Sequence, residues 1–208
     1  ASPVRLSLLA EPVTFSIPDR LSPCASPPLC VLVERLTVTP ADEDACADQY
    51  EIAQALTEAV GLPAYEISNH AAPGEESAHN LIYWRYQDYV GVGPGAHGRL
   101  TIGGDRLATE THLSPEAYLE AVEQTGAGVR LAEPLSAEAQ LTERLTMGLR
   151  LIEGVTLYAD DVFYEDEPRV DRLRRLIEDG FIADNCGRLS ATARGRPVLN
   201  RILYELLS

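Results

Sequence analysis

Residues 77–98 combine aromatic rings, imidazoles and glycines within one short stretch. This segment holds the only tryptophan, Trp84, and two of the four histidines, His79 and His97. Four glycines follow the aromatic residues within eight positions: Gly91, Gly93, Gly95 and Gly98. Flat aromatic faces, ring nitrogens that can bind a metal and a backbone with few side chains suit a site that accepts a flat apolar ligand.

His79 is the first candidate ligand-binding residue, because imidazole is a common axial ligand of heme iron. Asn80 follows it directly, and Tyr83 and Trp84 come a few positions later, where their rings could shield a porphyrin from water. The alternative is that His79 is an ordinary loop residue and that Tyr83 and Trp84 belong to the core, since histidine has many roles besides ligation. His97 is a second candidate with the same alternative.

The glycines at 93–98 match the dinucleotide pattern G-x-G-x-x-G. Pro94 removes a backbone donor, and a strand rather than a helix is predicted at 99–102, so we do not expect a dinucleotide site. The glycines either form a structural bend or let the backbone approach a ligand or a neighbouring strand closely. No Ser/His/Asp or Cys/His arrangement follows from the spacing, so the sequence predicts no catalytic residue.

The net charge of −15 argues against binding to the phosphate backbone of nucleic acids, which depends on many basic side chains. All 17 basic residues are arginine, so neither a Schiff-base lysine nor a phosphate-loop lysine is present. The cluster Arg172–Arg175 lies in a segment where acids outnumber arginines. We therefore interpret it as a solvated helix face and predict no nucleic-acid partner.

The four cysteines, Cys24, Cys30, Cys46 and Cys186, form no C-x-x-C pair and predict neither a disulfide framework nor a zinc site. The sequence has no apolar run of 18 residues and no signal-peptide pattern at its start. We therefore expect a cytoplasmic protein with reduced thiols.

The apolar pattern predicts an α/β domain over residues 35–128, preceded by an irregular segment at 1–34. A helix is expected from Thr39 to Val60, followed by a strand at 64–68. Farther along, the pattern predicts a hairpin of 99–102 with 106–110 and a helix at 114–124.

Residues 129–136 have no strong pattern and are predicted to be a linker to a separate module at 137–208. This module is predicted to contain a helix after Ser136, a short helix at 157–163 and a third helix from Pro168 to Gly180. A hairpin around 184–187 and a final helix from about Thr192 complete a winged-helix-like plan.

Three segments, 66–74, 79–84 and 88–98, resemble the HemW proteins, which are relatives of oxygen-independent coproporphyrinogen III oxidase (HemN) in the radical SAM superfamily. The hexapeptide H-N-x-x-Y-W at 79–84 distinguishes HemW-type heme chaperones from true coproporphyrinogen dehydrogenases. Residues 143–150 and 189–195 are similar to the HemN C-terminal domain. The resemblance covers residues 35–208.

The resemblance implies the C-terminal part of a radical SAM partial TIM-like barrel followed by a winged-helix-like α+β HemN C-terminal domain. It implies a heme site at His79, Asn80, Tyr83, Trp84 and His97, with His79 as the iron ligand. Heme would pass to respiratory proteins, and any membrane association would be peripheral and through these partners.

The full-length family also holds a [4Fe-4S] cluster and S-adenosylmethionine at a C-x-x-x-C-x-x-C motif. This sequence does not contain that motif, so we expect the chain not to be catalytic by itself. The alternatives are a coproporphyrinogen III oxidase-like enzyme of porphyrin biosynthesis and an inactive truncated fragment.

Overall fold

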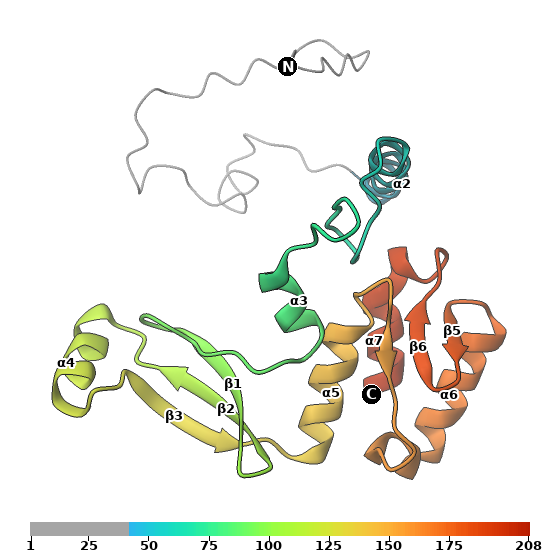
Figure 1. The fold of residues 1–208 in the computed structure, drawn as a ribbon. Coiled ribbons are helices and arrows are strands. Elements are labelled where there is room, and N and C mark those ends of the chain that lie inside the picture. Colours follow the sequence, from blue (N-terminus) through green and yellow to red (C-terminus); the bar gives the residue numbers. More distant parts are fainter. Residues whose placement is uncertain (1–41) are drawn as a thin grey trace, which may run out of the picture. The chain divides into compact units, whose positions relative to one another are not determined.

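The computed structural model describes residues 42–208 (Figure 1). The irregular segment predicted at 1–34 lies outside the described residues. Residues Asp44–Ser208 form one compact unit, and the predicted division into parts at 35–128 and 137–208 stays a prediction. Helices and two small antiparallel sheets give this region a mixed α/β fold.

Helix α2 (Glu43–Ala59) confirms the helix predicted there, although the predicted start at Thr39 lies outside the described residues. The helix is followed by Gly61, whose φ of +80° suits glycine. Ile52 and Leu56 lie four residues apart on one face of the helix, yet they keep 52% and 48% of their surface exposed. The apolar stripe of α2 is therefore largely open to solvent.

The strand predicted at 64–68 is wrong, because this segment forms only isolated bridges, Ala64 with His70 and Glu66 with Leu151. The buried carboxylate of Glu66 accepts hydrogen bonds from the backbone and hydroxyl of Ser68 at 3.0 Å each and from the Asn69 amide at 2.6 Å. A side chain that bonds its own neighbours in this way favours a tight loop over a continuous ladder.

Helix α3 (Ala78–Trp84) contains most of the hexapeptide at 79–84. Ser77 caps it, since its hydroxyl accepts a hydrogen bond from the backbone N–H of Asn80 at 3.3 Å. The chain leaves the helix at Arg85, and Tyr86 adopts a left-handed φ of 55°. Every residue of α3 keeps some solvent exposure.

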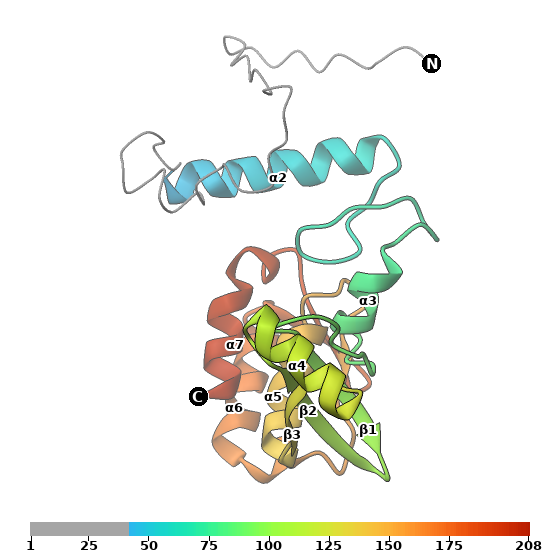
Figure 2. The same ribbon diagram turned by 90° about the vertical axis from the view of Figure 1, so that its left-hand side faces the viewer.

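The first sheet has the antiparallel order β1 (His97–Ile102), β2 (Asp105–Thr111) and β3 (Val129–Pro134) (Figure 2). The predicted hairpin of β1 with β2 is confirmed, and its turn is Gly103-Gly104, both with positive φ. Helix α4 (Pro115–Thr125), capped by Ser114, is also confirmed. The prediction of a linker at 129–136 is wrong, because most of this segment forms β3. The sequence did not indicate this strand, since β3 is almost wholly exposed and lacks the apolar alternation of a half-buried strand.

The C-terminal region confirms the predicted helix pattern and hairpin. Its elements are α5 (Ala137–Gly148), β4 (Val155–Thr156), η1 (Val162–Glu165), α6 (Glu167–Glu178), β5 (Ile182–Asn185), β6 (Arg188–Ala191), η2 (Arg196–Val198) and α7 (Leu199–Leu207). The strands form a second antiparallel sheet in the order β4-β6-β5. The short helix predicted at 157–163 is a 3₁₀ turn at η1, and the last α-helix starts later than predicted, after the 3₁₀ turn that contains Pro197.

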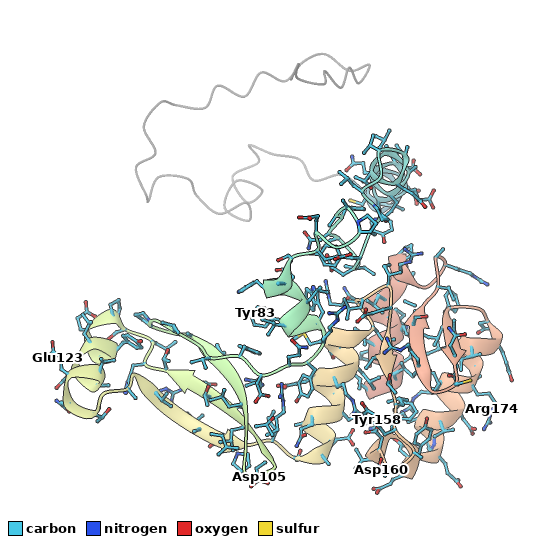
Figure 3. All side chains as sticks on the ribbon, viewed as in Figure 1. Tyr83, Asp105, Glu123, Tyr158, Asp160 and Arg174 are labelled. Carbon is cyan, nitrogen blue, oxygen red and sulfur yellow. The ribbon has the colours of Figure 1, made fainter. Side chains whose placement is uncertain are left out.

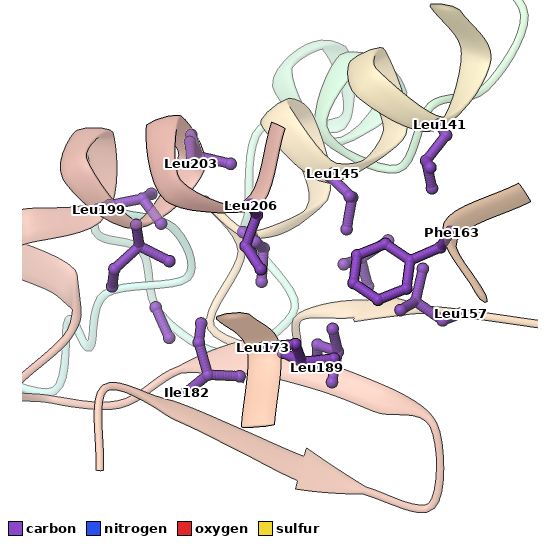
Figure 4. Close-up of a cluster of buried hydrophobic side chains, with 14 residues drawn as sticks. Leu141, Leu145, Leu157, Phe163, Leu173, Ile182, Leu189, Leu199, Leu203 and Leu206 are labelled. Carbon is purple, nitrogen blue, oxygen red and sulfur yellow. The ribbon is translucent and has the colours of Figure 1, made fainter. Parts of the chain in front are cut away.

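The apolar core of the described region lies in this C-terminal part and is built around α5 (Figure 4). Leu141, Leu145 and Leu149 repeat at a spacing of four and are at most 1% exposed. This spacing places them on one face of the helix, against Phe163, Leu189 and the apolar side of α7. The sheet β1-β2-β3 contributes no side chain to this cluster.

We predict that Leu145→Ala lowers the free energy of unfolding by about 3 kcal/mol, because it removes a fully buried side chain and leaves a cavity. Urea unfolding of the 208-residue chain measures this loss. Leu119→Ala is the matched control, since Leu119 on α4 is 58% exposed and should change stability by less than about 0.5 kcal/mol. Equal losses for the two variants would contradict the assignment of the core to α5.

Candidate functional site

Three aromatic side chains form a row along one side of α3. The rings of His79 and Tyr83 meet edge to face with centroids 4.8 Å apart, and those of Tyr83 and Tyr89 do so at 4.5 Å. The Tyr83 hydroxyl lies 3.2 Å from His79 Nε2, within hydrogen-bond distance. The first pair follows from the helix, because residues four apart share a face. Figure 3 shows Tyr83 on the side of α3 away from α5.

Trp84 is turned away from this aromatic row (His79, Tyr83 and Tyr89). Five residues along an α-helix correspond to a rotation of about 140°, so Trp84 and His79 occupy different faces of α3. The Arg150 guanidinium lies 5.1 Å from the centroid of the Trp84 ring. The buried indole N–H of Trp84 has no hydrogen-bond partner among residues 42–208. The five predicted site residues therefore do not form one cluster.

Asn80 and His97 lie outside the aromatic row as well. The Asn80 amide donates to the hydroxyl of Tyr65 at 3.2 Å. His97 begins β1, where its side chain is 60% exposed and Nδ1 lies 3.8 Å from a Glu110 oxygen. The structure therefore gives His97 a neighbouring carboxylate rather than the aromatic neighbours of His79.

Two glycines within residues 77–98 allow close contact between backbone segments. A Cβ on Gly91 would lie 2.5 Å from the carbonyl oxygen of His97, and one on Gly98 would lie 2.5 Å from the hydroxyl oxygen of Thr109. Both positions therefore require glycine for the approach of the 89–91 segment to β1. This supports the structural interpretation of these two glycines, and the segment pairs with β1 through a bridge between Tyr89 and Arg99.

Arg106 fixes the turn that follows α3. Its guanidinium donates to the carbonyl oxygens of Tyr86 and Gln87 at 3.0 Å each and to the carboxylate of Asp88, and it lies 4.0 Å from the centroid of the Tyr86 ring. The backbone N–H of Thr101 also donates to Asp88, and this bond is the main cause that lowers the pKa of the Asp88 carboxyl. These bonds stabilise the left-handed Tyr86 and so place Tyr89 against Tyr83.

Arg99 and Glu143 connect β1 to α5 through a bidentate ion pair. Arg99 Nη2 lies 2.6 Å from one Glu143 oxygen and Nε lies 2.9 Å from the other. Both side chains are mostly buried, with 19% and 23% exposed. Burial pushes the pKa of Glu143 upward, but the hydrogen bonds and charge of Arg99 outweigh burial, so the pKa is lowered. Burial and the nearby Glu143 raise the pKa of Tyr86 to about 12.

The described residues do not fit an iron–sulfur cluster. Cys46 and Cys186, the two cysteines within 42–208, are both exposed and far apart in sequence. No group of three or more His, Cys, Asp or Glu side chains in this region could hold a metal ion. Residues 42–208 also include no helix that is long and apolar enough to cross a membrane.

Sequence comparison identifies the relatives of this chain. The HemN C-terminal domain matches residues 135–198. The chain is 38% identical over 183 residues to heme chaperone HemW of Bacillus subtilis, covering 83% of this chain and 45% of that protein. It is 33% identical over 180 residues to radical S-adenosyl methionine domain-containing protein 1, mitochondrial, of Bos taurus, covering 80% of this chain and 40% of the relative.

Structure comparison agrees at the level of the fold. The Escherichia coli radical SAM enzyme coproporphyrinogen III oxidase (HemN) matches with a TM-score of 0.54 and 16% identity, over 76% of this chain and 40% of that one. The chain is therefore related by sequence to HemW-type proteins of the radical SAM superfamily. It spans less than half the length of the relatives it matches.

The sequence placed His79 and Tyr83 in one candidate site but did not indicate three features of the arrangement around them. Tyr89 was not among the predicted site residues, although an aromatic ring two residues before Gly91 is a signal that could have included it. The pair of Arg99 with Glu143 and the bonds of Arg106 are contacts across the fold. No spacing in the sequence indicates them.

We predict that Glu143→Gln lowers stability at pH 7 by about 1–2 kcal/mol, since it leaves Arg99 without its carboxylate while solvent screens part of the loss. The pKa of folded Glu143 lies below its ordinary value of 4.5. The folded state therefore binds fewer protons at this site than the unfolded state, so the stabilisation is complete above pH 4.5 and is lost as the pH falls through the lowered pKa.

Urea unfolding as a function of pH measures this difference, which should shrink on acidification below pH 4.5. Glu123→Gln on α4 is the control, because Glu123 is exposed (Figure 3) and should change stability little at any pH. A difference between wild type and Glu143→Gln that stays constant from pH 7 into the acid range would contradict the role of the ion pair.

Proposed function

We propose that this chain is the heme-binding C-terminal part of a HemW-like heme chaperone. The observation that carries the proposal is the exposed imidazole of His79, set in a row with Tyr83 and Tyr89 on an open face of α3. The relatives named heme chaperone HemW support the same function. Heme is the cargo in this proposal, and the predicted iron ligand is His79.

The arrangement around His79 suits a flat apolar ligand. Imidazole nitrogen is a good ligand for heme iron, and the rings of Tyr83 and Tyr89 provide apolar surface beside it. His79 is exposed and both tyrosines are half-buried, so a macrocycle could reach the imidazole without unfolding the helix. An open site of this kind also suits release of the cargo to an acceptor.

The finer predictions from the family resemblance extend this proposal. The acceptors would be respiratory proteins, and membrane association would be peripheral and through those partners. The chain would act in the cytoplasm. Residues 35–128 would be the end of a radical SAM partial barrel, and residues 137–208 would be a winged-helix-like domain. The antiparallel sheet β4-β6-β5 beside α5, α6 and α7 supports the latter plan.

The alternative is a coproporphyrinogen III oxidase-like enzyme, favoured by the fold of the structural neighbour that carries this name. The described residues offer no ligand set for the cluster that such chemistry requires. The ligands of such a cluster would therefore have to come from residues other than 42–208. Turnover of coproporphyrinogen III by a chain extended with cluster-binding sequence would support this alternative.

We predict that the 208-residue chain binds heme with a saturable shift of the Soret band and that His79→Ala abolishes the shift, because the variant removes the axial nitrogen. Titration of the chain with heme, followed by absorbance, measures binding. Added imidazole should restore the band in His79→Ala if the cavity left by the side chain accepts the free ligand.

His97→Ala is the matched control, since it removes an exposed imidazole that lies beside Glu110 rather than beside the tyrosines. It should keep the Soret shift of the wild type. A Soret shift that survives in His79→Ala and disappears in His97→Ala would show that His97, and not His79, is the iron ligand. The absence of saturable binding in a folded wild-type chain would reject the proposed function.

We further predict that Tyr83→Phe binds heme about twofold to tenfold more tightly than wild type. The hydroxyl of Tyr83 occupies His79 Nε2, and ligation through this nitrogen must first break a hydrogen bond worth about 0.5–1.5 kcal/mol. The phenylalanine ring keeps the apolar wall. Weaker binding by the variant would instead show that the hydroxyl orients the imidazole for ligation.

A further inference from the structure

An apolar groove, the α6–α7 groove, lies between two neighbouring helices of the C-terminal region (Figure 1, Figure 2). Its volume is about 370 Å³, which is within the range of ligand sites. The floor consists of Leu176 from α6, Phe181 from the turn after it, Val198 and Ile202. Val198 keeps 42% of its surface exposed, so the floor is open to solvent at this point.

Each helix contributes one face to the groove. The lining residues of α6 follow the spacing i, i+3, i+4, i+7, which places them on a single side of the helix, and those at the start of α7 and within it repeat this spacing. The residues are Arg172, Arg175, Leu176 and Asp179 from α6, and Val198, Arg201, Ile202 and Glu205 from the end of η2 and from α7. Both faces therefore combine apolar side chains with arginine.

The helix divides the arginine cluster at 172–175 between two surfaces. Arg174 pairs with Asp171 at 2.6 Å and its side chain is 62% exposed, as in a solvated helix face. Arg172 and Arg175 are three residues apart, so they share a side of α6, and both line the groove. Solvation alone therefore accounts for Arg174, whereas the other two arginines lie beside an apolar floor.

The arginines of the groove differ in how firmly they are held. Arg172 donates to the carbonyl oxygen of Ser208 at 2.6 Å. Arg201 pairs with Glu205 at 2.5 Å on the surface of α7, and an exposed pair of this kind adds little stability. The Arg175 guanidinium has no ion pair or hydrogen bond in the part of the chain that the structure describes. Arg175 and Arg201 are therefore available to a carboxylate on a ligand.

The groove is positive although the chain is acidic. Its lining holds three arginines against two acidic residues. Arg194 adds a positive charge beside the floor, because its guanidinium lies 4.5 Å from the centroid of the Phe181 ring. The net charge of the whole chain is −15. A local positive rim around an apolar floor is complementary to a ligand that is apolar along its middle and acidic at its flanks.

We propose that the α6–α7 groove binds an acidic amphipathic helix of a partner protein. The apolar stripe of such a helix enters the groove, as in other complexes in which a helix lies in an apolar groove. Aspartate or glutamate side chains on its flanks meet Arg175 and Arg201. The inference goes beyond the proposed function, since heme binding at His79 does not involve this groove.

The shape and charge of the groove favour a helix over a membrane surface. A recessed floor receives a ridge of side chains, whereas the apolar face of a membrane-bound segment is buried in the lipid. Binding to anionic lipids generally uses clusters of about four to eight basic residues. The groove has three arginines in its lining, and the rest of the chain is acidic.

The experiment uses a fluorescein-labelled peptide of about 18 residues, which is long enough for a helix of about five turns. It has leucines at the spacing i, i+3, i+4, i+7 and glutamates on both flanks of that stripe. A second peptide has glutamine in place of each glutamate. Fluorescence anisotropy with the full 208-residue chain measures binding. We expect the glutamate peptide to bind about fivefold to tenfold more tightly than the glutamine peptide, because only the first pairs with the arginines.

Arg175→Glu reverses a charge at the groove and should remove the preference for the glutamate peptide. Arg174→Glu is the matched control, because it makes the same change of net charge on the same helix outside the groove (Figure 3). The control should keep the full preference. This comparison separates contact with the groove from attraction by the charge of the whole chain.

Val198→Asp tests the apolar floor. Val198 is the N-cap residue of α7, a position that aspartate favours, so the variant should fold. A carboxylate in the floor should weaken binding of the glutamate peptide about tenfold, because it repels the glutamates and removes apolar contact. Unchanged binding by this variant would show that the peptide does not lie in the groove, and would overturn the proposal.

Equal affinity of the wild type for the two peptides would also overturn it, as would the same loss of preference in Arg174→Glu and Arg175→Glu. The absence of saturable binding of the glutamate peptide to a folded wild-type chain would reject it outright. Sedimentation with vesicles of phosphatidylcholine and phosphatidylglycerol is the last comparison. Vesicle binding that is lost in Arg175→Glu and kept in Arg174→Glu would assign the groove to a lipid surface instead of a helix.

Discussion

The ion pair between Arg99 and Glu143 is the interaction on which the position of the candidate site depends. It joins β1 to α5, and α5 is the element that is fixed most firmly, since its leucine face forms the centre of the core. The Tyr89 bridge to Arg99 then places the segment after α3 relative to this helix. The site is therefore held by polar contacts across the fold, while the hydrophobic effect stabilises only the helix that anchors them.

The distribution of buried side chains explains why the site remains open. In the described part of the chain, the apolar core lies between Leu141 and Leu206, and α3 has no fully buried residue. Regions with few buried apolar contacts open at lower free energy than the core. The proposed carrier, which must both take up and release a large flat ligand, benefits from such a region if a rigid helix holds it in position. Helix α5 meets this requirement, because its leucine face is packed in the core and its Glu143 pairs with Arg99.

Much of the C-terminal fold was predictable from the sequence, because Leu141, Leu145 and Leu149 repeat at helical spacing and Gly180 marks the end of α6. The exposed strand β3 was not predictable, since a strand without a buried face shows no alternation of apolar and polar residues. Of the predicted site residues, His79 and Tyr83 meet because residues four apart on a helix share a face, whereas the same geometry turns Trp84 away. A ligand-binding role for these residues stays a prediction. The arginine contacts depend on the tertiary fold, which brings positions such as 99 and 143 together.

The opposite orientation of Trp84 changes how the hexapeptide at 79–84 should be interpreted. A short helix with every residue partly exposed presents two different surfaces, the imidazole of His79 with its tyrosines on one side and the indole of Trp84 beside Arg150 on the other. A ligand that reaches the imidazole of His79 is separated from Trp84 by the width of the helix, which is about 10 Å. The tryptophan of the hexapeptide therefore has to be explained by its own neighbours at the end of α3, and not by the ligand proposed for His79.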